Sequence, residues 1–330
     1  MEHEATTSPS TTGALPIAVR VRRYLELIRF SHTVFALPFA LLACVMALTL
    51  PTPTGTPWEL TGGQWWQRLL GVLVCMVAAR SAAMAFNRLV DARYDALNPR
   101  TASRHLPAGL LTRSQVIAFF AACAVLFIAA TLLFLPNWLP MVLSPFVLLW
   151  ICGYSLAKRF TSAAHLWLGV ALAIAPMCAW LAIRGEVVQQ WPSDLWPTTW
   201  LALAIALWVC GFDIIYACQD ADFDRRAGLH SLPARLGLAG ALRLSALLHW
   251  SMLLVLLSWP WVVPSAGFGW TYAVAWIVVA VLVIRQHQLV RPDDLARVGE
   301  AFFSSKCMDQ PRILHLGSAR LPVLGRRISR

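Results

Sequence analysis

The feature that most constrains this chain is a series of apolar stretches, each near twenty residues long, between about residue 32 and residue 284. As α-helices, stretches of that length match the hydrocarbon thickness of a lipid bilayer. They lie at about residues 31–50, 66–86, 115–135, 138–157, 164–183, 197–217, 237–258 and 265–285. The composition agrees, with 58% hydrophobic and only 13% charged residues. The sequence therefore predicts an all-α, polytopic transmembrane helical bundle with about eight spans.

The two ends of the chain differ from these spans. Residues 1–30 are rich in Ser, Thr and Pro and lack the basic start and short apolar core of a signal peptide. We expect them to form a disordered cytoplasmic tail. Residues 31–290 then make up the transmembrane domain, and residues 291–330 are expected to be a poorly ordered cytoplasmic tail.

The loops between the spans alternate in character. The formal charge of +11 does not indicate nucleic-acid binding, because the basic residues are spread over loops and not gathered on a soluble domain. Alternate loops carry clusters of Arg, whereas the others are nearly free of basic residues and dense in Trp. The positive-inside rule places the Arg-rich loops and both termini in the cytoplasm. We expect the protein to lie in a bacterial inner membrane with its functional side cytoplasmic.

The first acidic motif, NRLVDARYD, directly follows the second span. It places Asn87, Asp91 and Asp95 four residues apart. On an α-helix this spacing drifts by only about 40° per step, so the three side chains share one face. Ionisable groups at a membrane are costly and usually have a function. The motif therefore predicts a functional face at the cytoplasmic end of this helix.

A second acidic motif, GFDIIYACQDADFDRRAGLHSLPARLG, follows the sixth span. Asp213, Asp220 and Asp224 fall in one helical stripe, with Tyr216 beside them. Asp222 points roughly the opposite way and is the weaker candidate. The sequence thus predicts two acidic faces on the same side of the membrane.

Two facing carboxylate sets repel each other unless cations lie between them. Mg²⁺ suits such a place, because it takes a few carboxylate oxygens and completes its shell with water and phosphate oxygens. Basic residues suited to phosphate lie close by in the sequence, namely Arg100, Arg104, Lys158, Arg159 and, as a further candidate, Arg29. Acids and bases together predict a metal–diphosphate site.

Several of these residues also have a structural interpretation. A single Asp next to Arg at a helix end is commonly a solvated ion pair, but two same-face sets argue against that here. Tyr154 and Tyr216 are either interface anchors or part of the site. His165 and His230 lack partners at metal-ligand spacing, which favours a structural role. The eight cysteines contain no C-x-x-C pair and are expected to be small buried apolar residues.

The segments NRLVDARYDALNPRTASRHLPAG and YACQDADFDRRAGLHSLPARLG resemble the two signature regions, N-x-x-x-D-x-x-x-D and D-x-x-x-D, of the UbiA superfamily of intramembrane aromatic prenyltransferases. GYSLAKRF is similar to a third family motif. Within the superfamily the chain looks most like the 4-hydroxybenzoate polyprenyltransferases and the related futalosine-route menaquinone enzymes. The resemblance runs from about Leu25 to Phe303.

This resemblance implies a helical fold with a central cavity and Mg²⁺ as cofactor. The implied metal ligands are Asn87, Asp91 and Asp95 for one ion, and Asp220 and Asp224 for a second. The implied diphosphate contacts are Arg100, Arg104, Lys158 and Arg159, with Asn87, Tyr154 and Tyr216 also at this site. Asp213 belongs to the same stripe and is a candidate proton acceptor.

The implied reaction joins a polyprenyl group from polyprenyl diphosphate to a hydroxylated aromatic acid resembling 4-hydroxybenzoate, in ubiquinone or menaquinone biosynthesis. The expected partners are these two substrates and membrane lipid, with no nucleic acid. Two rival classes are a cation-coupled transporter and a CDP-alcohol-type phosphotransferase. The acids lie at helix ends and not at mid-membrane, which speaks against the transporter. The D-G-x-x-A-R sequence that precedes the acidic motif of the phosphotransferases is missing.

The chain departs from the superfamily pattern at two places. His230 stands where many relatives have Lys or Arg. The superfamily usually has nine membrane helices, but the segment after DLARVGEAFF is too polar to span a bilayer, so a ninth helix is expected to be absent.

Overall fold

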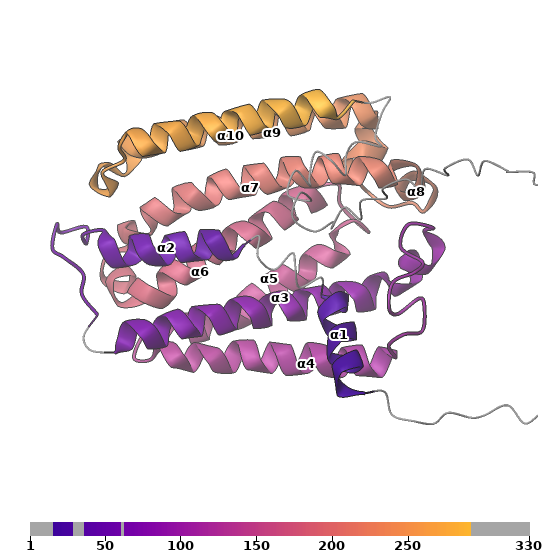
Figure 1. Ribbon diagram of the computed structural model, residues 1–330, viewed down its shortest axis with the longest axis horizontal. Helices are drawn as coiled ribbons and strands as arrows, with labels where there is room; N and C mark the ends of the chain where they lie inside the picture. The colour runs from indigo at the N-terminus through magenta and orange to yellow at the C-terminus, as the bar shows by residue number, and fades with distance from the viewer. Residues whose placement is uncertain (1–15, 29–35, 61–62, 292–330) are drawn as a thin grey trace, which may run out of the picture.

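The computed structural model describes residues 16–28, 36–60 and 63–291, and this part of the chain is all-α (Figure 1). The helices are α1 (Ile17–Leu27), α2 (Leu37–Thr49), α3 (Gln64–Leu97), α4 (Arg113–Ala130), α5 (Leu139–Ala157), α6 (Ala164–Gln190), α7 (Trp196–Ala217), α8 (Ala221–Arg226), α9 (Leu232–Val262) and α10 (Trp270–Leu289). Short 3-10 turns are η2 (Thr131–Phe134), η3 (Pro192–Leu195), η4 (Cys218–Asp220) and η5 (Pro264–Ala266).

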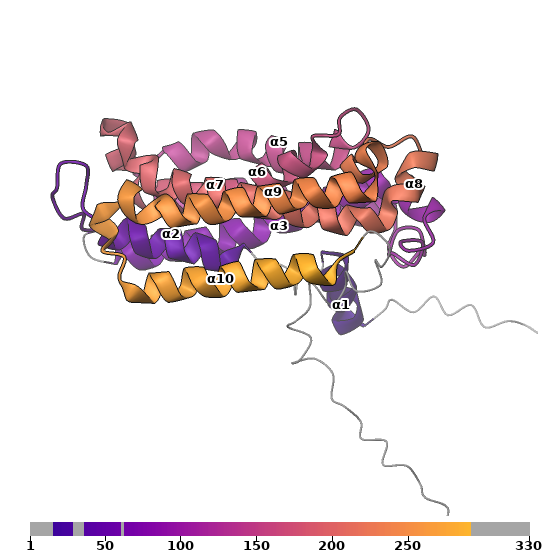
Figure 2. The same ribbon diagram turned by 90° about the horizontal axis from the view of Figure 1, so that it is seen from above.

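The eight predicted spans correspond to α2 to α7, α9 and α10. These helices run side by side in one bundle (Figures 1 and 2). In the described part of the chain, seven are long and apolar enough to cross a membrane, while α2 is shorter, with 13 residues. The polytopic helical prediction is therefore confirmed. The protein is an integral membrane protein.

Local sequence signals explain where several helices begin. Thr112 caps α4 by accepting a hydrogen bond from the backbone N–H of Gln115, whose side chain in turn accepts from the backbone N–H of Thr112. Ser231 caps α9 in a similar way, and Pro233 occupies the first turn of that helix, where its missing N–H costs nothing.

Small residues let the helices approach closely. At Gly169 of α6, a Cβ atom would lie 2.5 Å from the backbone oxygen of Ala206 on α7. At Gly211 of α7, it would lie 2.6 Å from the ring of His249 on α9. Backbone contact through small residues is a common way for helices to associate where lipid removes the hydrophobic driving force.

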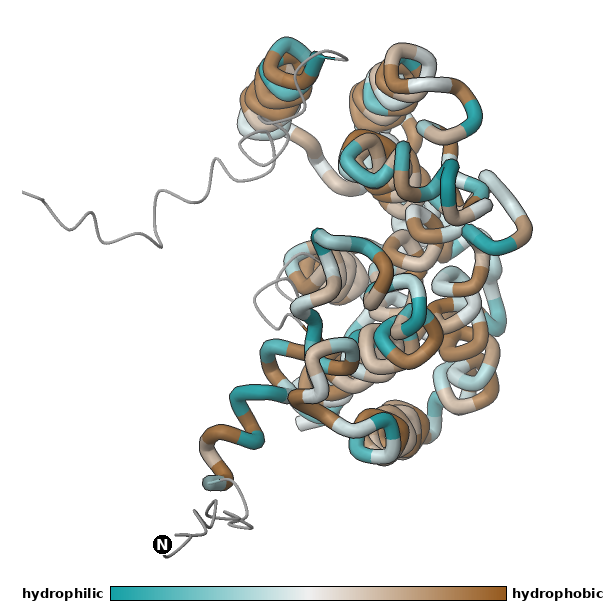
Figure 3. The backbone as a smooth tube through the Cα atoms, turned by 90° about the vertical axis from the view of Figure 1, so that its right-hand side faces the viewer, coloured by the Kyte–Doolittle hydropathy of each residue, from teal (hydrophilic) through white to brown (hydrophobic). Residues whose placement is uncertain are grey.

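The two acidic motifs lie at the same end of the bundle, where α3 and α7 end and α4 and α9 begin. We call this the motif end. Figure 3 looks onto it and shows the helices in an open arc, with hydrophilic residues gathered in the facing loops. α3 is longer than the predicted span and carries the whole of the first motif within one helix.

Two arginines lie toward the opposite, Trp-rich end and are both neutralised. Arg184 is fully buried and donates to Asp194 Oδ1 at 2.7 Å and to the backbone oxygen of Leu50 at 2.7 Å. Arg68 pairs with Glu186. These ion pairs explain how an arginine in α3 and one in α6 are tolerated toward an end of the bundle that is otherwise nearly free of basic residues.

The expectation that residues 1–30 form a disordered tail is wrong for part of that range. α1 covers Ile17–Leu27 and lies across the direction of the bundle (Figure 1). Leu27 is buried against Ala85, Leu89 and Val116, and Tyr24 stacks on a ring of α4. These apolar contacts pack α1 against α3 and α4. The three arginines of α1 had suggested a polar tail. Residues 1–15 lie outside the described residues, and so does the predicted tail 291–330 apart from Arg291, together with the question of a ninth helix.

Candidate active site

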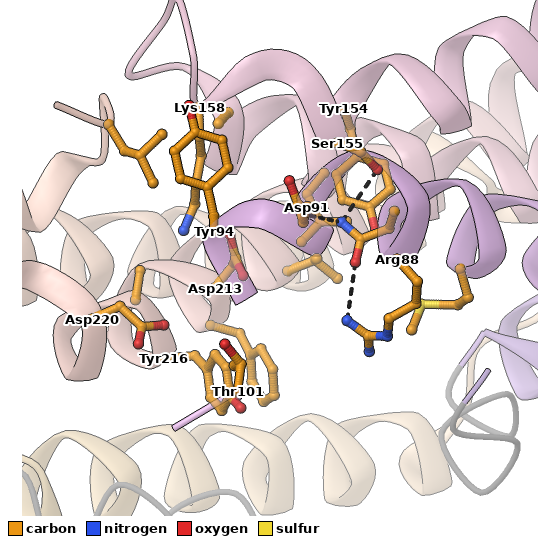
Figure 4. Close-up of a pocket in the computed structure, with 18 of the residues that line it drawn as sticks. Arg88, Asp91, Tyr94, Thr101, Tyr154, Ser155, Lys158, Asp213, Tyr216 and Asp220 are labelled. Atoms are coloured by element: carbon orange, nitrogen blue, oxygen red, sulfur yellow. Dashed lines mark hydrogen bonds between the residues drawn. The ribbon is translucent and has the colours of Figure 1, made fainter. Parts of the chain in front are cut away.

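A cavity of about 460 Å³ opens at the motif end. The first acidic motif lines it from α3. Asn87 donates from Nδ2 to Asp91 Oδ2 at 2.8 Å and to Ser155 Oγ at 3.4 Å. Figure 4 shows the two acceptor residues, Asp91 and Ser155, in this cavity. Asp95 lines the same cavity one turn further along. The helical spacing thus places all three side chains on one face, as predicted.

The second acidic motif also lines this cavity, but not as a single helix. Asp213 lies on α7, Asp220 in the 3-10 turn η4 and Asp224 on the short helix α8. The prediction of one continuous α-helical stripe is wrong, because a 3-10 turn advances by fewer residues per turn and re-aims the chain after Ala217. Asp222 points away, with a side chain that is 85% exposed and 3.3 Å from Arg225.

Each acid of the two signature regions is paired with a base. Asp95 contacts Arg104 at 2.6 Å, and Asp91 contacts Arg159 at 3.4 Å. The remaining pairs connect separate parts of the chain: Arg100 Nε donates to Asp220 Oδ1 at 2.9 Å, and Lys158 Nζ lies 3.6 Å from Asp224 Oδ2. All of these residues line the cavity. Opposed acids therefore coexist here because cationic side chains lie between them.

Arg100 makes the largest set of these contacts. Its Nη1 donates to the hydroxyl of Tyr216 at 2.9 Å, and its guanidinium lies over the Tyr216 ring at 5.3 Å. Burial alone would lower the pKa of Arg100, but the hydrogen bond and charge of Asp220 raise it overall. Asn98 donates to the same Asp220 oxygen at 3.2 Å and accepts the backbone N–H of Arg100.

The surroundings of two carboxylate oxygens indicate whether a metal ion could bind here. Asp95 Oδ2 and Asp224 Oδ2 are buried and have no hydrogen-bond partner among the described residues. Within that part of the chain no three His, Cys, Asp or Glu side chains are close enough to form a closed metal cluster. Mg²⁺ needs no such cluster, because it takes one or two carboxylates and fills its shell with water and phosphate oxygens. The unsatisfied oxygens suit an ion of this kind.

A second, apolar cavity of about 350 Å³ lies among α3, α4, α5 and α6. It shares Arg80, Met84, Tyr154, Leu168 and Leu172 with the first cavity, so the two are adjacent. Its deeper lining includes Phe127, Phe134 and Leu181. A chamber that contains the charged residues of the motif end thus adjoins an almost wholly apolar one within the bundle.

Two further residues belong to this region that the sequence motifs did not predict, Arg80 at the cavity and His165 behind it. Arg80 lies seven residues, about two helical turns, before Asn87, and an arginine inside an apolar run was the signal that could have found it. It lines both cavities, and its Nε is buried with no hydrogen-bond partner in the described part of the chain. His165 contacts Asp213 at 2.6 Å. His230 is exposed, and Arg29 lies outside the described residues.

Comparison with known proteins gives the family. The model of the UbiA prenyltransferase family matches residues 36–307. The chain belongs to this family. A UbiA homologue from Aeropyrum pernix K1 has 32% sequence identity and a TM-score of 0.68, over 82% of this chain and 92% of that one. A UbiA homologue from Archaeoglobus fulgidus bound to GPP and Mg²⁺ has 18% identity and a TM-score of 0.59, over 84% and 95% of the two chains, and supports the UbiA fold alone.

Relatives within the UbiA family carry a consistent name. A 4-hydroxybenzoate octaprenyltransferase of Pseudoalteromonas atlantica is 29% identical over 76% of this chain and 79% of its own length. That of Tolumonas auensis is 33% identical over 64% and 70%. The match to the Aliivibrio fischeri enzyme, at 32% identity, spans 55% of this chain and 62% of the relative. UbiA membership confirms the expected resemblance and favours a prenyltransferase over a transporter or a CDP-alcohol-type phosphotransferase.

Proposed function

We propose that this protein transfers a polyprenyl group from polyprenyl diphosphate to a ring carbon of a hydroxylated aromatic acid, with release of diphosphate. The single observation that carries the proposal is the pair of adjacent cavities, one with charged residues at the motif end and one apolar inside the bundle. A polyprenyl diphosphate has the same polarity along its length, with a charged headgroup and an apolar tail. The names of the UbiA relatives support the aromatic acid as acceptor.

The four acid–base pairs provide the headgroup site. Asn87, Asp91, Asp95, Asp220 and Asp224 would hold Mg²⁺, and Arg100, Arg104, Lys158 and Arg159 would hold diphosphate oxygens. Bound Mg²⁺ would supply positive charge that stabilises the departing diphosphate. With both bound, the acids would be neutralised by the metal and the bases by the phosphate oxygens, so that no charged side chain would be left without a partner.

The basic side chains favour breakage of the C–O bond, because they stabilise the negative charge that develops on the diphosphate. The allylic cation left behind needs protection from water and from stray nucleophiles. Tyr154 lies where the polar and apolar cavities meet, so its ring face can stabilise that cation. Apolar neighbours such as Leu168 and Leu172 exclude water there.

Arg80 and Asp213 complete the acceptor site. The guanidinium of Arg80, which has no acidic partner among the described residues, would pair with the carboxylate of the aromatic acid. The ring carbon ortho to the hydroxyl then attacks the allylic cation. Asp213 lines the polar cavity and would accept the ring proton, which restores aromaticity.

We further propose that the motif end faces the cytoplasm across a bacterial inner membrane, because the Arg-rich loops gather there. The product would then be a precursor of a quinone, with 4-hydroxybenzoate the first acceptor to test.

The direct test supplies the full-length protein in lipid nanodiscs with octaprenyl diphosphate, Mg²⁺ and a panel of aromatic acids. We expect one acid to yield a prenylated product, identified by mass, together with one equivalent of diphosphate, and we expect EDTA to abolish both. Absence of a ring-prenylated product across the panel, with or without diphosphate release, would contradict the proposal.

A further inference from the structure

His165 is a fully buried histidine on α6 that does not line either cavity. It contacts Asp213, which does line the cavity at the motif end. Its Nδ1 is 2.6 Å from Asp213 Oδ2, across 48 positions of sequence. On either side of it along α6, Ala164 and Leu168 reach the wall of the polar cavity. Among the described residues, Asp213 is the cavity-lining side chain to which His165 hydrogen-bonds.

A second contact fixes which ring nitrogen carries the proton. The backbone N–H of Leu232, at the first residue of α9, donates to His165 Nε2 at 3.3 Å. A nitrogen that accepts a hydrogen bond presents its lone pair, so the proton of the neutral ring is on Nδ1. Nδ1–H then donates to Asp213 Oδ2. Both ring nitrogens are satisfied without a charge on the imidazole, as burial requires.

The opposite oxygen of Asp213 has different surroundings. No described residue donates a hydrogen bond to Asp213 Oδ1, and the side chain, 23% exposed, contributes to the cavity wall (Figure 4). One oxygen of the carboxylate, Oδ2, is thus hydrogen-bonded to His165, while Oδ1 has no donor among the described residues. A donor that holds one oxygen fixes the rotation of the carboxylate and so the direction of the remaining lone pairs.

We propose that His165 is a positioning residue that keeps Asp213 Oδ1 aimed at the ring proton of the aromatic acceptor. This inference rests on the proposed prenyl transfer. After the new C–C bond has formed, the C–H bond at the same ring carbon breaks and its electron pair returns to the ring. The proton moves to Asp213 Oδ1, while Oδ2 keeps the hydrogen bond from His165. The resulting carboxylic acid then loses its proton through the polar end of the cavity.

Two substitutions separate the contact to Asp213 from the contact to Leu232. In His165→Asn, the amide nitrogen takes the place of Nδ1, so the donor to Asp213 is kept and the acceptor for Leu232 is lost. In His165→Gln, the amide oxygen takes the place of Nε2, so the acceptor for Leu232 is kept and the donor to Asp213 is lost. If His165 acts through Asp213, Asn rescues the function and Gln does not.

The measurement compares an ordinary acceptor with one deuterated at both positions ortho to the hydroxyl. We expect His165→Gln to lower kcat about tenfold, as when a partner that orients a functional group is removed, with the KM for polyprenyl diphosphate unchanged. A primary isotope effect should appear, because C–H breakage becomes slow. Asp213→Asn should show the same isotope effect with a larger loss, about a hundredfold. His165→Asn should keep most of the turnover and show no isotope effect.

His249→Asn is the matched control, because His249 is also fully buried in the bundle but has no contact with Asp213. It should lower thermal stability without an isotope effect. Equal losses in His165→Asn and His165→Gln, or no isotope effect in His165→Gln and Asp213→Asn, would overturn the inference. If wild-type protein makes no ring-prenylated product, the proposed function itself has failed, so the two failures are distinguishable.

Discussion

Arg100 and Asp220 are 120 residues apart in the chain, yet the Nε of one donates to the Oδ1 of the other at 2.9 Å. This pair joins the loop after α3 to the turn η4 after α7. Asn98 strengthens the junction by bonding to both residues. The two acidic motifs therefore belong to one chamber and are joined by direct hydrogen bonds.

The first prediction concerns Asp220. Replacing it by Asn removes a negative charge from the chamber while keeping the side chain's shape, but only one of the two oxygens that accept hydrogen bonds from Arg100 remains. We expect prenyl transfer to fall about 100-fold or more, the size typical of losing one electrostatic contact to a developing charge. Initial rates in nanodiscs at several Mg²⁺ concentrations measure this.

Asp222→Asn provides the control for this substitution. Asp222 is two residues away, largely exposed and paired only with Arg225 in the described structure. Its substitution should leave the rate unchanged. Equal effects at both positions would mean that the loss reflects general charge on this segment and not the chamber.

A second prediction tests Arg80 as the partner of the acceptor's carboxylate. A hydrogen bond to a charged group is worth about 1.5–3 kcal/mol, so Arg80→Gln should raise the KM for the aromatic acid roughly 10–100-fold. The KM for polyprenyl diphosphate should stay the same. Repeating the assay with a phenol that lacks the carboxylate should give similar rates for both proteins, and a persistent difference would argue against this pairing.

A third prediction uses the junction of the two cavities. Leu172 lines both of them, so Leu172→Trp should narrow the passage between headgroup and tail sites. Overpacking costs about 1–3 kcal/mol, which corresponds to a rise in KM of roughly tenfold for a long donor. A donor with a single five-carbon unit should be affected less.

Leu166→Trp is the matched control for the junction, because Leu166 is on the same helix and 49% exposed. It should behave like wild type with both donors. Loss of long-chain transfer in this variant would show that added bulk on α6 disturbs the fold and does not block a passage.

A fourth prediction concerns stability at the opposite end of the bundle. Asp194 accepts hydrogen bonds from Arg184 and from Trp180 Nε1, and all three side chains are buried. Asp194→Ala leaves a buried guanidinium without its carboxylate, which should lower the free energy of unfolding by about 3–5 kcal/mol. Thermal unfolding in detergent measures the loss. A double variant, Arg184→Met with Asp194→Leu, should recover much of it.

The bundle could be predicted from the sequence because bilayer thickness fixes the length of each span. The α3 motif was also predictable, since its i, i+4, i+8 spacing survives in a regular helix. The geometry of the second motif was less predictable, because the 3-10 turn η4 interrupts the α-helical periodicity between Asp213 and Asp220. His165 gave no local signal, since its role depends on a contact 48 residues away. Helix α1 was not predicted, because its arginines obscured the apolar residues, such as Leu27, that pack against the bundle.

The paired charges of the chamber also bear on which ligands it would select. In the proposed function, a phosphate that bound alone and displaced Asp220 from Arg100 would leave this carboxylate without its basic partner. A metal ion bound together with the diphosphate would supply the positive charge that the carboxylate needs. The ion pairs would therefore favour the metal–diphosphate complex over free inorganic phosphate.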